Sequence, residues 1–104
     1  MKKKTNQVLA YAIKDIKSNG FNFLISKKTK DNFIDIISYK NNAIIFIQLK
    51  ELTPKKNIEY NNAIISNIFK YDIQAFYKLD VPFNVIKEMW VYIKKNGFYK
   101  IPIK

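Results

Sequence analysis

The sequence predicts a mixed α+β fold of the α/β class, with the element order α-β-β-β-α-β and an additional C-terminal β-hairpin. Three observations predict it: apolar residues at helical spacing near the N-terminus, two apolar runs joined by Asn41-Asn42, and two further apolar runs around Asn96-Gly97. The 104 residues contain no repeat or linker. We therefore expect one domain over residues 1–104.

The first predicted element is a helix that begins at Thr5, a residue type that caps helix N-termini. Gly20 suits the left-handed position at which many helices end. The next segment, Phe21–Ser26, has the composition of a strand. The buried stripe of the helix is expected to consist of Val8, Leu9, Ala12, Ile13 and Ile16.

A hairpin is predicted over the apolar runs Phe33–Tyr39 and Ala43–Lys50. Asn tolerates the positive φ that a two-residue turn demands, so Asn41-Asn42 would form the turn and Lys40 would face Ala43. This register fixes which side chains of the two strands lie opposite one another.

Three polar side chains on this hairpin are predicted to lie on one face of the sheet. Counting outward from the turn places Asp35 opposite Gln48. Lys50 shares the face of Gln48, since residues two apart on a strand point the same way. A carboxylate, an amide oxygen and an ammonium together form a plausible site for a divalent metal and a phosphate group.

The remaining elements follow from the same signals. Thr53-Pro54 breaks the third strand, and Pro82 places its neighbours in a loop because proline is excluded from central strands. In order, the segments are a helix from about Lys56 to Tyr71, a fourth strand at Gln74–Lys78, a loop at Asp80–Asn84, and a hairpin formed by Glu88–Lys94 and Phe98–Ile103.

The composition restricts the chemistry of any active site. Cysteine and histidine are absent, which excludes disulfides, thiolate zinc sites, imidazole ligands and Ser-His-Asp or Cys-His nucleophilic catalysis. Catalysis would have to use carboxylates, lysine, tyrosine or a hard metal ion bound by oxygen. No apolar run approaches the roughly 20 residues that span a bilayer, and no signal peptide is evident. The expected location is the cytoplasm, or the host cytoplasm for a viral protein.

The formal net charge of +11 favours a nucleic acid as the partner. Arginine is absent, so the forked contact to guanine is unavailable and binding should follow the backbone. The candidate phosphate contacts, each alternatively an ordinary solvated charge, are Lys27, Lys28 and Lys30 before the second strand and Lys55 and Lys56 after the third. The tyrosines that could stack on bases, or instead belong to the core or a subunit interface, are Tyr11, Tyr60, Tyr71, Tyr77, Tyr92 and Tyr99.

The motif strands resemble a known nuclease superfamily. Asp35, twelve intervening residues and then Gln48-Leu49-Lys50, within this element order, are similar to the PD-(D/E)XK pattern. Within that superfamily, the chain looks most like small archaeal and phage proteins related to Holliday-junction resolvases. The stretches that carry the resemblance are Phe33–Ile37, Ile45–Lys50, Glu88–Ile93 and Phe98–Ile103.

The resemblance implies a restriction-endonuclease-like core and a metal-dependent DNA endonuclease, with branched DNA among its substrates. Asp35 would bind Mg²⁺ or Mn²⁺, Gln48 would occupy the usual acidic position, and the Leu49 carbonyl would be a further metal ligand. Lys50 would position the attacking water or stabilise negative charge. Resolvase-like members also supply a first-helix acid, where this chain has Asn6 and Gln7.

A homodimer is also predicted, both from the habits of resolvase-like nucleases and from an apolar edge on the last hairpin. That edge would comprise Trp90, Tyr92 and Ile101. Two other functions stay open: a catalytically inactive nuclease fold that binds nucleic acid, and a basic viral or host domain that binds an acidic protein. Whether Asp31, Glu51 or Glu59 completes the site also stays open.

Overall fold

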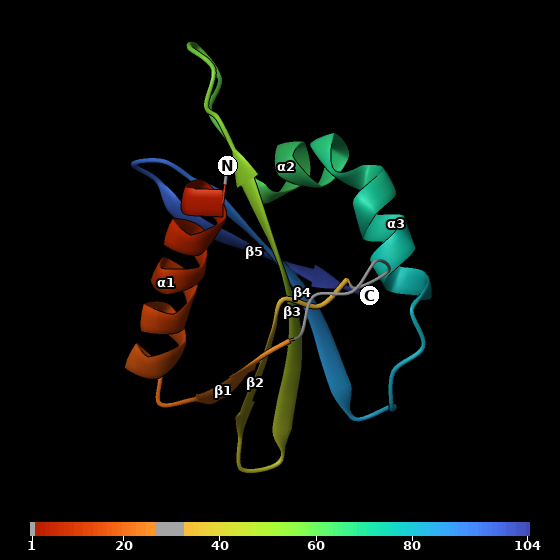
Figure 1. Cartoon of the computed structure of the whole chain (residues 1–104). Coiled ribbons are helices and arrows are strands. Elements are labelled where there is room, and N and C mark those ends of the chain that lie inside the picture. Colours follow the sequence, from red (N-terminus) through yellow and green to blue (C-terminus); the bar gives the residue numbers. More distant parts are fainter. Residues whose placement is uncertain (1, 27–32) are drawn as a thin grey trace.

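The computed structural model describes residues 2–26 and 33–104 and is a mixed α+β structure, which confirms the predicted fold class (Figure 1). The elements in chain order are α1 (Lys2–Ser18), β1 (Asn22–Ile25), β2 (Ile36–Lys40), β3 (Ala43–Leu52), α2 (Asn62–Ile68), α3 (Lys70–Lys78), β4 (Val85–Ile93) and β5 (Gly97–Ile103).

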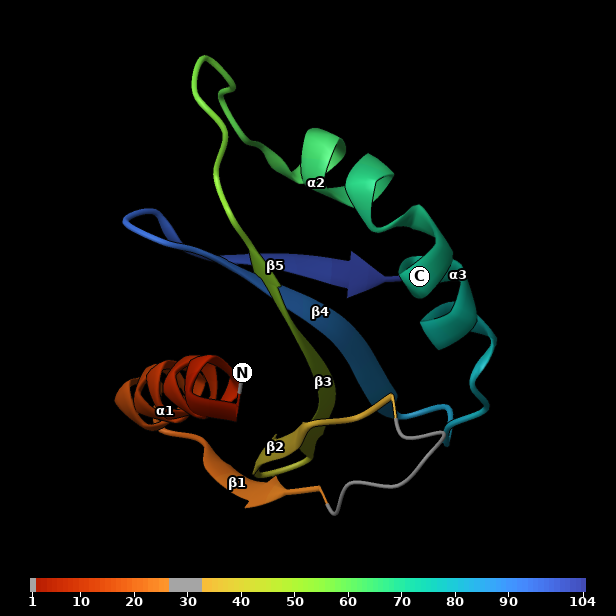
Figure 2. The ribbon, with the colours of Figure 1, turned by 45° about the horizontal axis from the view of Figure 1, so that its top comes forward.

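The five strands form one sheet in the order β1-β2-β3-β4-β5. β3 and β4 are parallel, whereas the other neighbouring pairs are antiparallel. The parallel pair requires a crossover connection, and α2 and α3 supply it. Figure 2 shows α1 on one face of the sheet and α2 with α3 on the other.

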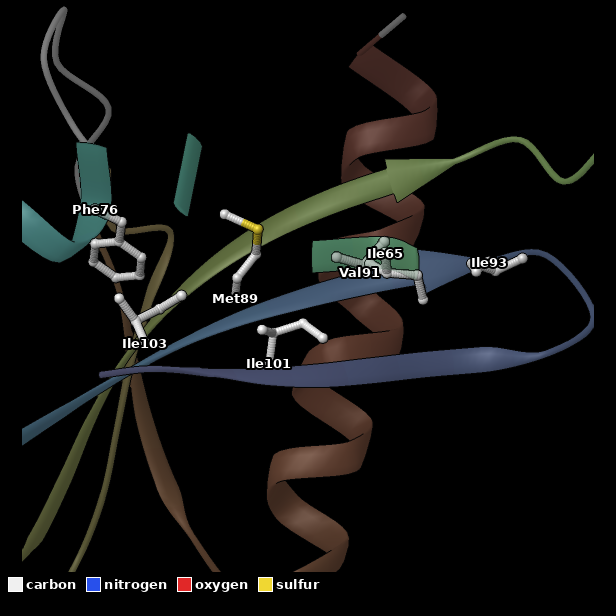
Figure 3. Close-up of a cluster of buried hydrophobic side chains, with 7 residues drawn as sticks. All are labelled: Ile65, Phe76, Met89, Val91, Ile93, Ile101 and Ile103. Atoms are coloured by element: carbon white, nitrogen blue, oxygen red, sulfur yellow. The ribbon is translucent and has the colours of Figure 1, made fainter. Parts of the chain in front are cut away.

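Each face of the sheet buries its own apolar cluster. On the α1 face, the buried residues are Ala12, Ile16, Ile36, Ile47 and Trp90. The opposite cluster, shown in Figure 3, consists of Ile65, Phe76, Met89, Val91, Ile93, Ile101 and Ile103. β4 contributes to both clusters because successive strand residues point to opposite faces.

The predictions for the first helix and for the turn between β2 and β3 are confirmed, apart from the residue at which the helix begins. Val8, Ala12 and Ile16 are buried, as the stripe predicted. Asn41 has a φ of 53°, and Lys40 pairs with Ala43 as the predicted turn requires. The boundary is wrong, since α1 begins at Lys2 and Thr5 lies inside the helix rather than capping it.

The prediction of a fourth strand at Gln74–Lys78 is wrong, because this segment belongs to α3. Phe69, Ile73 and Phe76 all pack against the same cluster, and their spacing is that of one helical face. The predicted helix from Lys56 to Tyr71 begins too early and joins α2 to the start of α3, which are separate helices.

The helix α2, which follows β3 after a coil segment, begins only at Asn62. Asn61 caps α2, its side-chain oxygen accepting a hydrogen bond from the Ile64 N–H at 2.9 Å. The fourth strand is β4, which follows both helices. It pairs with β5 to form the C-terminal hairpin, so only β5 is additional to the α-β-β-β-α-β order that was predicted. Its connection comprises residues 94–96, because Ile93 pairs with Gly97.

Lys87 on β4 fixes the C-terminal end of α3. Its Nζ donates hydrogen bonds to the carbonyl oxygens of Phe76, Tyr77 and Leu79, at 2.8, 2.7 and 2.9 Å. The Phe76 carbonyl also accepts from the Leu79 N–H at 3.1 Å. A cation at the C-terminal end of a helix interacts favourably with the helix dipole as well. The contact fixes the position of α3 relative to the sheet.

The apolar edge on which a homodimer was predicted is not exposed. Trp90 and Ile101 are only 4% and 5% exposed, because they pack into the two clusters of the same chain. Within the described residues, no helix is long and apolar enough to cross a membrane.

Candidate functional site

The candidate site lies where β3 continues past the end of β2. The register of the two strands ends at the pair Ile36 and Ile47, whereas β3 runs on to Leu52 and pairs with β4 over that length. Among the described residues, positions 48–52 of β3 therefore have no regular strand partner on the side that faces β2. Open backbone groups at such a position can hydrogen-bond to side chains or ligands.

Asp35 lies in a bend directly before β2, one residue beyond the regular register. Its backbone N–H donates to the Ile47 carbonyl at 2.8 Å, and its carbonyl accepts from the Ser26 N–H at 2.9 Å. The backbone of Asp35 is thus held from both neighbouring strands. The Asp35–Gln48 pair that simple counting predicts is not part of the ladder, because the chain bends at this residue.

The Asp35 carboxylate instead contacts the backbone of β3. Oδ2 accepts a hydrogen bond from the Leu49 N–H at 2.7 Å, so the side chain replaces a missing strand partner. The structure thereby brings Asp35 to the Gln48-Leu49-Lys50 segment. The N–H and C=O of a strand residue point to the same side, so the Leu49 carbonyl is also directed away from β4. The Leu49 side chain packs against the α1 cluster.

Gln48 has a buried side-chain oxygen for which the described residues provide no hydrogen-bond donor. Its side chain is 8% exposed, and no donor within the described part of the chain reaches Oε1. Leaving such a group unsatisfied costs about 1 to 3 kcal/mol. A buried acceptor of this kind requires an explanation, and a role as the ligand of a cation is one.

The Asp35 carboxylate, the Gln48 amide oxygen and the Leu49 carbonyl are oxygen atoms of the kind that a hard cation accepts. A carboxylate, an amide oxygen and a peptide carbonyl are oxygen ligands, and Mg²⁺ needs only one or two carboxylates when substrate phosphates complete its shell. Across residues 2–26 and 33–104, no group of three or more Asp, Glu, His or Cys side chains is placed to bind a metal. The residues fit a metal that is shared with a phosphate group.

Lys50 forms an ion pair with an acid that was not predicted from sequence. Its Nζ lies 3.3 Å from Oδ1 of Asp72, and the two side chains are 27% and 48% exposed. Phe46 packs against the α2–α3 cluster, so strand alternation places Gln48 and Lys50 on that same face. Asp72 belongs to the first turn of α3.

The other predicted site residues are distributed as follows. Lys27, Lys28, Lys30 and Asp31 lie outside the described residues. Lys55, Lys56 and Glu59 are exposed in the segment between β3 and α2, and Glu51 lines a hollow beside α1. Asp15, an acid of α1 that the sequence did not place in the site, forms an ion pair with Lys100 at 2.8 Å.

Gln48→Met is expected to raise the free energy of unfolding in metal-free buffer by about 1 to 3 kcal/mol, because it replaces the unsatisfied carbonyl with an apolar group of similar size. Chemical denaturation in EDTA measures this change. Gln74→Met is the matched control on an exposed position of α3, where a change within about 0.5 kcal/mol is expected. A destabilised Gln48→Met protein would show that Oε1 has a partner in solution.

Comparisons with known proteins assign no family to this chain. No protein-family model matches it, and no curated protein matches it. Function is therefore inferred from the side chains at the end of β3.

Proposed function

We propose that this protein is a metal-dependent DNA endonuclease that hydrolyses phosphodiester bonds at the end of β3. The observation that carries the proposal is the Asp35 carboxylate, bound to the Leu49 N–H beside a buried Gln48 oxygen that lacks a donor among the described residues. The element order, with a helical crossover between β3 and β4, agrees with the order expected of a PD-(D/E)XK core.

Each residue of the site has a distinct role in this proposal. Asp35, Gln48 and the Leu49 carbonyl would hold Mg²⁺ or Mn²⁺, which supplies the positive charge that activates water and polarises the phosphodiester. The Lys50 ammonium orients the attacking water or stabilises the charge that develops on the phosphate. Asp72 pairs with that ammonium at 3.3 Å and would release it to the phosphate when DNA binds.

The partner in this proposal is DNA, including branched DNA, bound through its backbone. The charge of +11 attracts a polyanion, and the absence of arginine favours contacts to phosphates over base recognition. Lys55 and Lys56 directly follow the site along the chain and are exposed. Lys27, Lys28 and Lys30 remain predicted contacts. We place the activity in the cytoplasm, or in the host cytoplasm for a viral protein, and a homodimer remains a prediction.

Incubation of the wild-type protein with labelled duplex, single-stranded and four-way DNA tests the proposal. Cleavage of at least one substrate is expected with Mg²⁺ or Mn²⁺, and none with EDTA, because the site lacks the charge to activate water by itself. Fragment patterns on a denaturing gel measure the outcome. Absence of cleavage with every substrate and both metals would rule out the enzyme.

A second candidate is a nuclease fold that binds DNA without cutting it. The ion pair between Lys50 and Asp72 favours it, since a lysine already paired with an acid is less available to a phosphate. This function predicts binding that persists in EDTA, weakens steeply with salt and is accompanied by no cleavage. The same incubations, run beside a binding assay, separate the two candidates.

A further inference from the structure

A pocket of about 310 Å³ lies between the C-terminal end of α1 and the sheet. Its floor contains Ser38 of β2, Ile45 of β3 and Glu88 of β4. Asp15 and Asn19 line the side that α1 and the turn after it form. None of these residues belongs to the candidate site at the end of β3. We call this hollow the Glu88 pocket.

One side of the Glu88 pocket is formed by an ion pair whose charges cancel. The Lys100 Nζ lies 2.8 Å from Oδ1 of Asp15, and the Asn19 Nδ2 donates a hydrogen bond to the same oxygen at 3.1 Å. The Lys100 Nζ also lies 4.3 Å from the centroid of the Trp90 ring. Both charged groups thus have partners within the chain, and together they give the pocket no net charge.

Glu88 is half-buried and adds one negative charge that no cation compensates within the described residues. Its Oε1 accepts a hydrogen bond from the Trp90 Nε1–H at 2.8 Å, and no described lysine forms an ion pair with its carboxylate. Lys40, beside the pocket, is exposed, and its Nζ lies 3.5 Å from the Asn19 carbonyl oxygen instead. A partly desolvated carboxylate is stabilised by a nearby cation. The pocket therefore favours a positively charged ligand.

Ser38 supplies a second polar group that the chain itself does not use. The residue is only 2% exposed, yet no hydrogen bond joins its hydroxyl to another group among the described residues. A serine hydroxyl can both donate and accept, so it matches a hydroxyl of a ligand. Ile45, the cross-strand partner of Ser38, lies in the floor on the strand between Ser38 and Glu88. The backbones of β2 and β4 are about 10 Å apart, which is two strand spacings, so an apolar segment of the ligand would cover Ile45.

We infer that the Glu88 pocket binds a small aliphatic amine that also carries a hydroxyl group. The ammonium pairs with the Glu88 carboxylate, the methylene groups lie over Ile45, and the hydroxyl forms a hydrogen bond with Ser38. A single positive charge suits this pocket, because the chain already carries a formal net charge of +11 and a second ammonium would meet only the neutral Ser38. Binding of this ligand requires neither DNA nor a metal, so the inference goes beyond the proposed function.

Trp90 reports on the pocket, because it is the only tryptophan in the chain and donates its indole N–H to Glu88. The probe is aminopentanol, which has an amine and a hydroxyl at opposite ends, and the NMR signal of the indole N–H is followed during titration at constant pH in EDTA. A saturable shift is expected, with a dissociation constant of about 1 mM, an affinity that so few atoms can supply.

Two substitutions test the two ends of the ligand separately. Glu88→Gln removes the charge but keeps an acceptor for the indole N–H, and it should weaken aminopentanol binding about 10- to 150-fold. Ser38→Ala should weaken aminopentanol binding about 2- to 10-fold and leave the binding of pentylamine, which lacks the hydroxyl, unchanged. Because Ser38→Ala removes a hydroxyl that has no partner among the described residues, the fold should be retained.

The matched control is Glu51→Gln, which removes an exposed acid of β3 outside this pocket and changes the net charge of the chain equally. Its affinity for aminopentanol should equal that of the wild type. The inference is overturned if the wild-type signal does not saturate, if Glu51→Gln weakens binding as much as Glu88→Gln does, or if pentanol or pentanoate binds as tightly as aminopentanol. Unchanged affinity in either Glu88→Gln or Ser38→Ala would also overturn it. None of these outcomes involves DNA cleavage, so failure of the nuclease proposal is distinguishable from failure of this inference.

Discussion

Lys50→Ala is expected to lower the rate of metal-dependent DNA cleavage about 100- to 1000-fold, the usual effect of removing one group that stabilises transition-state charge. The fold should survive, because the ion pair that the substitution breaks is partly exposed and contributes at most about 1 kcal/mol. Cleavage rates at saturating metal, with thermal unfolding measured in parallel, test both statements.

Asp72→Asn is the control that breaks the same ion pair while keeping the ammonium. It frees Lys50 from its acidic partner, so cleavage should be retained or increased. If Asp72→Asn and Lys50→Ala lose activity equally, the ion pair itself is required, and Lys50 does not act directly on the substrate. If neither variant changes the rate, the active site lies elsewhere.

Lys87→Met is expected to lower the free energy of unfolding by about 2 to 3 kcal/mol, because three carbonyl oxygens lose a charged donor at a helix C-terminus. Methionine keeps the length and apolar character of the side chain, so the loss reports mainly the hydrogen bonds to Phe76, Tyr77 and Leu79. Chemical denaturation followed by circular dichroism measures it.

Lys78→Met is the matched control at the same end of α3. Lys78 is exposed, and among the described residues it donates no hydrogen bond to those carbonyls. Only its interaction with the helix dipole is lost, which amounts to about 1 kcal/mol or less. Equal destabilisation by the two substitutions would mean that the charge near the helix end matters and the three contacts do not.

Features that depend on nearby residues were predictable from sequence. The α1 stripe and the β2–β3 turn are encoded within a few positions, and the structure confirms both. The position of the Leu49 side chain on the opposite face from Gln48 and Lys50 follows from strand alternation alone. In each case one local rule acts without competition from distant parts of the chain.

Features that depend on distant contacts were not predictable in the same way. The segment Gln74–Lys78 contains apolar and aromatic residues that suit a strand, and its helical phase is evident only when Phe69 and Ile73 are included. Asp72 was missed for the same reason, since its approach to Lys50 requires α3 to pack on the sheet. The contact of Asp35 with the Leu49 N–H arises because β2 begins only at Ile36, which no local pattern indicates.

The position of β4 between β3 and β5 has a consequence for protein synthesis. This strand is bonded to β3 on one side and β5 on the other, and its side chains enter both clusters. Ribosomes deliver it after α1, α2 and α3, so the nascent polypeptide exposes the apolar faces of all three helices while translation continues. We expect such a chain to need chaperone protection until β4 leaves the exit tunnel, after which both layers can close together.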